Sequence, residues 1–169
     1  MNNKKWNVAA VDGLMLSLIT ILYTLINSAF SPGSAVMVVL WIVKLVATLW
    51  LLLYFVKEYN KDMESFTYKQ GFNFAFITSF LSAVFVAGYF FLHYALIFPG
   101  DIDKIADTIS QAMSARGATD TSITDAIIGY FPHIMFISNL VYLTIFGIIA
   151  SAIIANYTKK GDIFTQEKM

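Results

Sequence analysis

Hydrophobic residues are gathered into four long runs that polar segments separate. The runs cover about residues 8–30, 35–56, 72–98 and 134–157. Each has at least the roughly 20 residues that an α-helix needs to cross a hydrocarbon core about 30 Å thick. The pattern therefore predicts an all-α membrane protein, a bundle of four transmembrane helices. The runs leave no segment long enough for a soluble domain, so we expect one integral membrane domain over residues 1–169.

The connection between the third and fourth runs, about residues 99–131, has a helical pattern of its own. Ile102, Ile105, Ile109 and Met113 recur at helical spacing, with polar residues between them. A second start signal follows, because Ser122 and Asp125 resemble a capping box that leads towards Pro132. We expect two short helices that fold over the membrane mouth or lie in the interface. They serve either as a cover for the bundle or as a contact surface for a ligand or partner.

The composition supports lipid as the solvent. Of the 169 residues, 58% are hydrophobic and 13% are charged, against roughly 25% charged residues in soluble domains. The absence of cysteine excludes disulfides, thiolate metal sites and cysteine nucleophiles. The first run follows a basic segment, as a signal peptide would, but it exceeds the usual length of about 7–15 apolar residues. We therefore expect an uncleaved first helix.

Basic residues are distributed unevenly among the connections. The first and third connections hold only Lys104 and Arg116. The terminal segments and the second connection hold eight lysines: Lys4, Lys5, Lys57, Lys61, Lys69, Lys159, Lys160 and Lys168. The positive-inside rule then predicts that both termini are cytoplasmic. The third connection has five aspartates against two basic residues, a net charge of −3, which argues against a nucleic-acid partner or an anionic-lipid surface on that side.

Lys44 lies within the second apolar run and is the first candidate for a functional residue. A lysine at the centre of a span costs about 2.5–3.5 kcal/mol on insertion scales, so its ammonium needs water, a partner or a route to the interface. Asp12 is the acidic residue of the spans, but it lies near the cytoplasmic end of its helix, whereas Lys44 is about 18 Å from that end at 1.5 Å per residue. We expect Lys44 to reach towards the outer mouth, where polar groups or loop aspartates receive it. Three roles stay open: a structural lysine, a binding or transport residue, and a direct pair with Asp12.

Other polar residues of the spans are weaker candidates. His93 and His133 both lie near the predicted outer ends of their helices and could together bind a metal or sense pH. Two ligands are a weak metal signature, and interfacial histidines are the commoner case. Asn139, like Asn73 and Asn156, is expected to form hydrogen bonds between helices. Small residues recur on single helix faces, which predicts close helix packing: Gly13, Ser17, Thr20, Thr24 and Asn27; Ser79, Ala83 and Ala87; Gly147, Ser151 and Ala155.

A family resemblance begins at "VKEYNKDMESFTYKQGFNFAF", residues 56–76. This stretch resembles the four-helix membrane proteins of the domain-of-unknown-function family 4199, found in Bacteroidota. The matching positions are Lys57, Tyr59, Phe66, Thr67, Tyr68, Gln70, Gly71 and Phe72; Ser65 and Gly71 depart mildly from the family's usual glycine and alanine. The outer segment "ARGATDTSITDAI" and the lysines after the last span are also similar. The resemblance implies the cytoplasmic membrane of a bacterium of that group and implies no activity.

The same stretch also has a physical interpretation. Phe66 and Tyr68 are expected to anchor the start of the third helix in the membrane interface. Thr67 is expected to cap that helix, and Gln70 to satisfy N–H groups of its first turn. The alternative is that Phe66, Tyr68 and Gln70 form a cytoplasmic docking site for a membrane-associated partner.

The sequence lacks enzyme signatures such as H-E-x-x-H, G-x-S-x-G or a phosphate-binding glycine loop. We expect no catalytic residues, no cofactor and no metal. The first hypothesis is a non-enzymatic accessory or assembly protein of the bacterial inner membrane, in contact with membrane lipids and with a membrane protein partner or further copies of itself. The alternative is a small oligomeric transporter or channel in which Lys44 lines a polar path. An enzyme that acts on lipid is a third, less favoured hypothesis.

Overall fold

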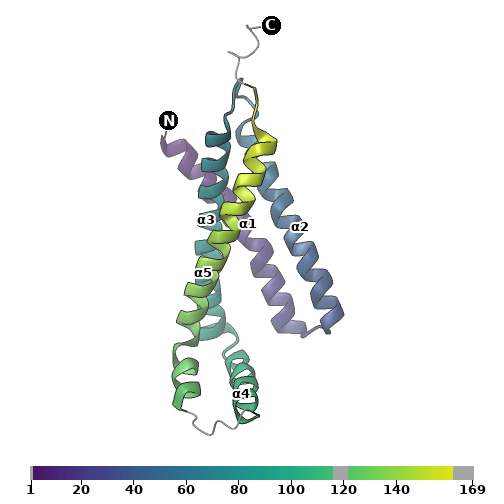
Figure 1. Cartoon of the computed structure of the whole chain (residues 1–169), viewed down its shortest axis with the longest axis vertical. Coiled ribbons are helices and arrows are strands. Elements are labelled where there is room, and N and C mark those ends of the chain that lie inside the picture. Colours follow the sequence, from purple (N-terminus) through teal and green to yellow (C-terminus); the bar gives the residue numbers. More distant parts are fainter. Residues whose placement is uncertain (1, 116–121, 162–169) are drawn as a thin grey trace.

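The computed structural model confirms four helices that are long and apolar enough to cross a membrane. It describes residues 2–115 and 122–161. Its helices are α1 (Asn2–Phe30), α2 (Ser34–Tyr59), α3 (Tyr68–Leu92) with the π-helical turn η1 (His93–Ile97), α4 (Gly100–Ser114) and α5 (Ser122–Thr158) (Figure 1). The four candidate spans are Lys5–Phe30, Ser34–Tyr59, Tyr68–Ile97 and Ile127–Thr158. The chain is therefore an all-α, multi-pass membrane protein.

The start of α1 and the end of α5 lie at the same end of the bundle, at the top of Figure 1. We call this the termini end, and the opposite end, below which α4 lies, the hairpin end. The distribution of lysines predicts that the termini end faces the cytoplasm.

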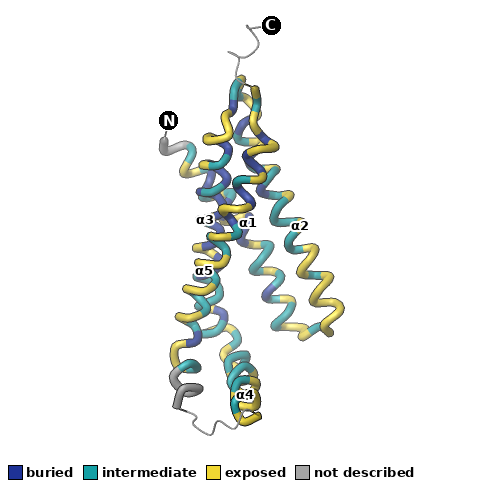
Figure 2. Tube along the Cα trace, viewed as in Figure 1, coloured by how far each residue is buried: buried dark blue, intermediate teal, exposed yellow. Residues whose placement is uncertain are grey.

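Helix α3 is the centre of the bundle. It packs against α1 and against α5, whereas α2 has its main neighbour in α1 and is peripheral. In the most apolar window of each span, 44% of the residues of α3 are buried and only 6% of those of α2, a contrast that Figure 2 shows along both helices. Within α2 only Leu52 and Val56 are buried. Its remaining apolar side chains face outward, where lipid is their natural solvent.

Small residues bring the backbones of the central helices together, as the sequence predicts. A Cβ atom added at Gly13 of α1 would lie 2.8 Å from the carbonyl oxygen of Thr78 in α3, and one at Gly147 of α5 would lie 2.9 Å from Cβ of Ser79. The predicted small-residue faces are buried at Gly13, Ser17, Thr24, Ser79, Ala83, Ala87, Gly147, Ser151 and Ala155, and half-buried at Thr20 and Asn27. Such close approach supplies the packing that holds helices together in lipid.

At the termini end, the connection between α2 and α3 is hydrogen-bonded to the end of α5. Asn60 Nδ2 donates to the carbonyl oxygen of Thr158 at 3.0 Å. The backbone N–H of Lys160 donates to the carbonyl oxygen of Phe66 at 2.9 Å. The ammonium of Lys160 donates to three backbone carbonyls of the connection, those of Asn60, Lys61 and Met63, at 2.6, 3.2 and 3.0 Å. The carbonyl of Asn60, the C-cap residue of α2, accepts the shortest of these bonds. Since carbonyls at a helix C-terminus carry partial negative charge, Lys160 caps the end of α2.

At the hairpin end the structure differs from the prediction for the outer connection. The expected second short helix is not separate, because residues 122–131 form the start of α5, which continues through Pro132. A proline inside a helix removes one hydrogen bond, so Pro132 predicts a helix boundary. Here the buried ring of Phe131 packs edge-on against Tyr94, with centroids 5.0 Å apart. This tertiary contact supports the helix next to the proline.

The first expected outer helix is present as α4, but its placement differs. Ile102, Ile105 and Ile109 are half-buried, while Asp103 and Asp107 are exposed, which fits the packing of α4 against α5 and confirms an amphipathic helix. Together α4 and the first turns of α5 form a helical hairpin that extends beyond the ends of α1 and α2 (Figure 1). The hairpin neither closes the mouth of the bundle nor lies across it.

Candidate binding groove and polar cluster

Lys44 lines a groove that all four spans form. Its other polar lining includes Thr20 of α1, Ser79 and Ser82 of α3, and Tyr142 of α5. The groove holds about 650 Å³ of non-atom space, including its open part. Trp41 of α2 and Tyr142 of α5 are 45% and 60% exposed on its two sides. The groove therefore opens between α2 and α5, towards the membrane.

The ammonium of Lys44 lies over an aromatic ring. Its Nζ atom is 4.6 Å from the centroid of Tyr23 in α1, within the roughly 6 Å at which the face of a ring attracts a cation. The ion pairs of residues 2–115 and 122–161 do not include Lys44. Asp12 lines a different groove near the termini end, with Lys5 and Glu58. Asp12 and Lys44 therefore do not pair, as their depths predict, and the receiving group is Tyr23 instead of an aspartate of the outer connection.

Ser79 adds an unsatisfied hydroxyl to this groove. Its side chain is 7% exposed, and its Oγ atom has no hydrogen-bond partner within the described part of the chain. Burial of a polar group without a partner is costly, above all in a bilayer that contains no water to replace the lost bonds. The groove thus offers a cation and a free hydroxyl on apolar walls.

A second polar site, which we call the His93 cluster, lies at the hairpin end. His93 is 1% exposed and sits in η1. Its Nδ1 atom is 2.9 Å from Tyr89 Oη, and its Nε2 atom is 3.1 Å from Ser28 Oγ and 3.6 Å from Asp101 Oδ2. Asp101 Oδ1 accepts a hydrogen bond from Lys104 Nζ at 2.7 Å. The cluster therefore connects α1, the end of α3 and the start of α4.

The geometry of the His93 cluster favours a positioning role. Serine, histidine and aspartate are the residue types of a catalytic triad, in which serine and aspartate contact opposite nitrogens of the ring. Here Ser28 and Asp101 both face Nε2, and Nδ1 is occupied by Tyr89. The hydrogen bond from Lys104 holds the pKa of Asp101 below its ordinary value, so this carboxylate stays charged at neutral pH.

The two histidines have separate surroundings. His93 is buried instead of interfacial, and its ring contacts are with the aromatic residues around it: Tyr89, Phe90, Tyr94 and Phe98. His133 is exposed, with its ring edge-on to Phe91 at 5.2 Å. Among the residues that the structure describes, no group of three or more histidine and acidic side chains is close enough to hold a metal ion.

Asn139 does not form the expected bond between helices. Its Nδ2 atom donates to the carbonyl oxygen of Met135, one turn earlier in α5, at 2.8 Å. A carbonyl at i−4 is always within reach of a helical side chain, so it competes with more distant acceptors. Asn139 is therefore satisfied within its own helix.

The motif at the start of α3 is partly as predicted. Thr67 and Gln70 form a capping box, in which the Thr67 N–H donates to Gln70 Oε1 at 2.8 Å and the Gln70 N–H donates to Thr67 Oγ1 at 3.3 Å. Tyr68 is 44% exposed, as an interfacial anchor would be. Phe66 is fully buried instead, because its backbone pairs with Lys160 and its ring meets Tyr59 edge-on at 6.3 Å. The prediction of an exposed anchor at Phe66 was wrong.

Comparison with known proteins identifies the family. A family model described as a protein of unknown function (DUF4199) matches residues 9–160, which include the greater part of all four spans. The chain belongs to this family. No curated protein and no solved structure gives a match. Because the DUF4199 description names no activity, a function has to be argued from the geometry of this member.

In this DUF4199 protein, some residues carry polar contacts that the sequence pattern does not predict. Tyr23 receives Lys44, Ser28 contacts His93, and Lys160 caps α2. The signal for the first two is indirect: a lysine or histidine within an apolar run requires a polar or aromatic partner from another helix. Which helix supplies that partner is not encoded in the spacing along the chain.

Proposed function

We propose that this protein is a non-enzymatic accessory protein of the bacterial inner membrane that binds a partner membrane protein through α4. The observation that supports this proposal is the position of α4, which extends beyond the ends of α1 and α2 (Figure 1). The His93 cluster fixes the start of α4 to the bundle through Asp101. A rigid helix held outside the spans is a suitable contact element for a neighbour in the same membrane.

The charge of α4 indicates the chemistry of that partner. Asp103 and Asp107 are exposed, and the lysine of this helix, Lys104, is engaged by Asp101. Three aspartates against one lysine give α4 a net charge of −2. Electrostatic complementarity then favours a partner with a basic surface outside the membrane.

The non-enzymatic part of the proposal rests on the chemistry of the two polar sites. In the His93 cluster, Nε2 faces Ser28 and Asp101 together, so the ring cannot relay a proton from the serine to the aspartate. In the groove, Lys44 lies over an aromatic ring, with no base beside it among the lining residues. Both sites are better suited to holding a group in place than to reacting with it.

Site-specific photo-crosslinking of the full-length protein in native membranes tests the proposal. A crosslinker at the exposed positions Thr108 or Gln111 of α4 is expected to give one discrete adduct with a different membrane protein. The double variant Asp103→Lys, Asp107→Lys is expected to lose that adduct by charge reversal. A crosslinker at Ile149, on the exposed apolar face of α5, is the matched control and should give lipid adducts only. An adduct that charge reversal leaves unchanged, or one with a second copy of this chain, would contradict the proposal.

A small oligomeric transporter is the second candidate. It is favoured by Lys44, a charged residue of a groove to which Thr20, Ser79 and Ser82 contribute hydroxyl groups. Uptake of small anions into proteoliposomes distinguishes the candidates. A transporter would show flux that Lys44→Met abolishes, whereas an accessory protein would show none.

A further inference from the structure

We propose that the Lys44 groove binds an anionic phospholipid of the leaflet at the hairpin end. The headgroup phosphate would pair with the Lys44 ammonium, and an acyl chain would lie in the groove between α2 and α5. This site is separate from α4, so it does not depend on the partner proposed above. The bound lipid would have a structural or regulatory role, and the positive charge of Lys44 would select a lipid with an anionic headgroup.

The charge of the groove requires an anion. Lys44 is the charged residue among all those that line it. The ring of Tyr23 provides a partial negative potential at 4.6 Å, but a ring quadrupole offsets an ammonium less completely than an ion does. A phosphate supplies a full counter-charge as well as acceptor oxygens.

The depth of the ammonium is within reach of a headgroup. The Lys44 ammonium lies over Tyr23, which is seven residues before the end of α1 at Phe30. Seven residues correspond to about 10 Å along the helix at 1.5 Å per residue. The 26 residues of α2 give a length of about 39 Å, so each end extends roughly 4–5 Å past a 30 Å core. The ammonium is thus only about 6 Å below the hydrocarbon edge. The side chain of Lys44 also leans towards the start of α2, which is at the hairpin end, so a slight local thinning of the bilayer lets a phosphate reach it.

The lining of the groove suits an acyl chain. Its lining extends along α2 from Trp41 to Leu52, a distance of about 16 Å. The lining along that length is mostly apolar and includes Leu45 and Leu52 of α2, Val86 of α3 and Leu143 of α5. An elongated apolar groove that opens towards the membrane suits a hydrocarbon chain.

The acidic hairpin does not oppose this arrangement. The sequence argues against anionic lipid around the outer connection because of its aspartates, but Asp103 and Asp107 are exposed on α4, and Asp101 faces Lys104 and His93. Figure 1 shows α4 below the end of α3, beside the first turns of α5 and away from the start of α2. Charges in water are screened beyond about 8 Å at physiological ionic strength, whereas Lys44 acts within the low-dielectric groove.

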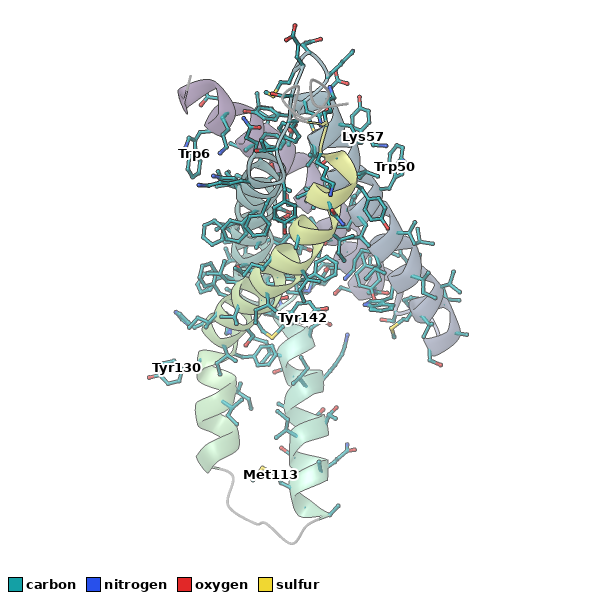
Figure 3. The ribbon with its side chains drawn as sticks, turned by 45° about the horizontal axis from the view of Figure 1, so that its top comes forward. Trp6, Trp50, Lys57, Met113, Tyr130 and Tyr142 are labelled. Carbon is teal, nitrogen blue, oxygen red and sulfur yellow. The ribbon has the colours of Figure 1, made fainter. Side chains whose placement is uncertain are left out.

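Tryptophan quenching by brominated lipids tests the proposal on the full chain in vesicles. The protein has three tryptophans; Trp41 is at the groove, and Trp6 and Trp50 point away from the bundle (Figure 3). A variant with Trp6→Phe and Trp50→Phe reports on the groove alone. Brominated phosphatidylglycerol is expected to displace phosphatidylcholine at Trp41 with about fivefold preference, the ratio that corresponds to roughly 1 kcal/mol. Lys44→Gln should reduce the preference to about one, and Lys44→Arg should retain it, since arginine also pairs with phosphate.

The matched control keeps Trp50 alone, through Trp6→Phe and Trp41→Phe. Trp50 is 65% exposed on α2, and both brominated lipids should quench it equally. Equal quenching of Trp41 by the two lipids in the protein with Lys44 would overturn the proposal, and this comparison does not depend on the folding of any Lys44 variant. A preference that survives in Lys44→Gln would also overturn it. So would a Trp41 that neither lipid quenches, because a protein segment would then cover the groove.

Discussion

The two ends of the bundle are held together in different ways. At the termini end, Tyr59 of α2 stacks on Phe74 of α3 with centroids 3.9 Å apart, and Asn60 and Lys160 tie the α2–α3 connection to α5. At the hairpin end, α2 has no buried residue before Leu52. There the side chain of His93 reaches from η1 to Ser28 of α1. One end is packed and cross-connected, whereas at the other α2 is largely exposed and a polar contact joins α1 to η1.

This contrast assigns stability and binding to different ends of the molecule. Regions with few buried contacts open at low free-energy cost, and ligand sites are commonly found in them. Lys44 lies on the part of α2 that is largely exposed. A lipid in the groove would therefore add contacts where the bundle has the fewest, and changes at the two ends should differ sharply in cost.

The largest expected effect is at the termini end. Phe74 is fully buried and stacked on Tyr59, so Phe74→Ala should lower the free energy of unfolding by about 3 kcal/mol, the lower end of the range for such truncations, because packing is the main attraction between helices in lipid. Phe80→Ala is the control on the same helix, since Phe80 is 39% exposed, and it should cost less than about 1 kcal/mol. Reversible unfolding by SDS in mixed micelles, followed by circular dichroism, measures both. Equal losses would remove the distinction between packed and exposed faces of α3.

A smaller effect is expected from the ammonium that caps α2. Lys160→Ala removes an ammonium that donates to three backbone carbonyls, of which that of Asn60 keeps a hydrogen bond from the Met63 N–H. We expect a loss of about 1.5 kcal/mol, as for hydrogen bonds to charged groups. Lys159→Ala is the matched control, because Lys159 is exposed, and should cost less than about 0.5 kcal/mol. The same unfolding measurement applies. If both alanine variants are equally stable, the contacts of Lys160 contribute nothing to the termini end.

The local features of this fold follow from the sequence, whereas the polar contacts between helices do not. Four apolar runs predict the spans, and the spacing of Gly13 and Gly147 predicts where helices touch, because one helix face is defined by one stretch of chain. The capping box of Thr67 and Gln70 is equally local. Lys44, by contrast, finds Tyr23 on another helix. The choice of that acceptor depends on rotation and tilt, which the pattern of one chain leaves undetermined.

Two errors have the same origin in tertiary contacts that override a local rule. Pro132 predicts the end of a helix because proline removes one backbone hydrogen bond. However, α5 continues through Pro132, next to the contact of Phe131 with Tyr94. Phe66 stands before a helix where an interfacial aromatic is common, but its backbone bridges to Lys160 and its side chain is buried. In each case the partner is at least 36 residues away in the chain. Sequence patterns of a single chain do not register such distant partners.

The smallest expected effect is at the hairpin end, at the ion pair of Asp101 and Lys104. Lys104 is 70% exposed, so Lys104→Ala should cost only about 0.3–0.5 kcal/mol at pH 7. The hydrogen bond from Lys104 lowers the pKa of Asp101 below 3.8. The contribution of the pair is therefore fully present above that ordinary value and is lost as the pH falls through the lower native pKa. Unfolding curves at a series of pH values should show the unaltered protein and Lys104→Ala converging in acid. A difference that persists below the native pKa would show that Lys104 acts through packing and not through its charge, and the hairpin end would then be held by more than polar contacts.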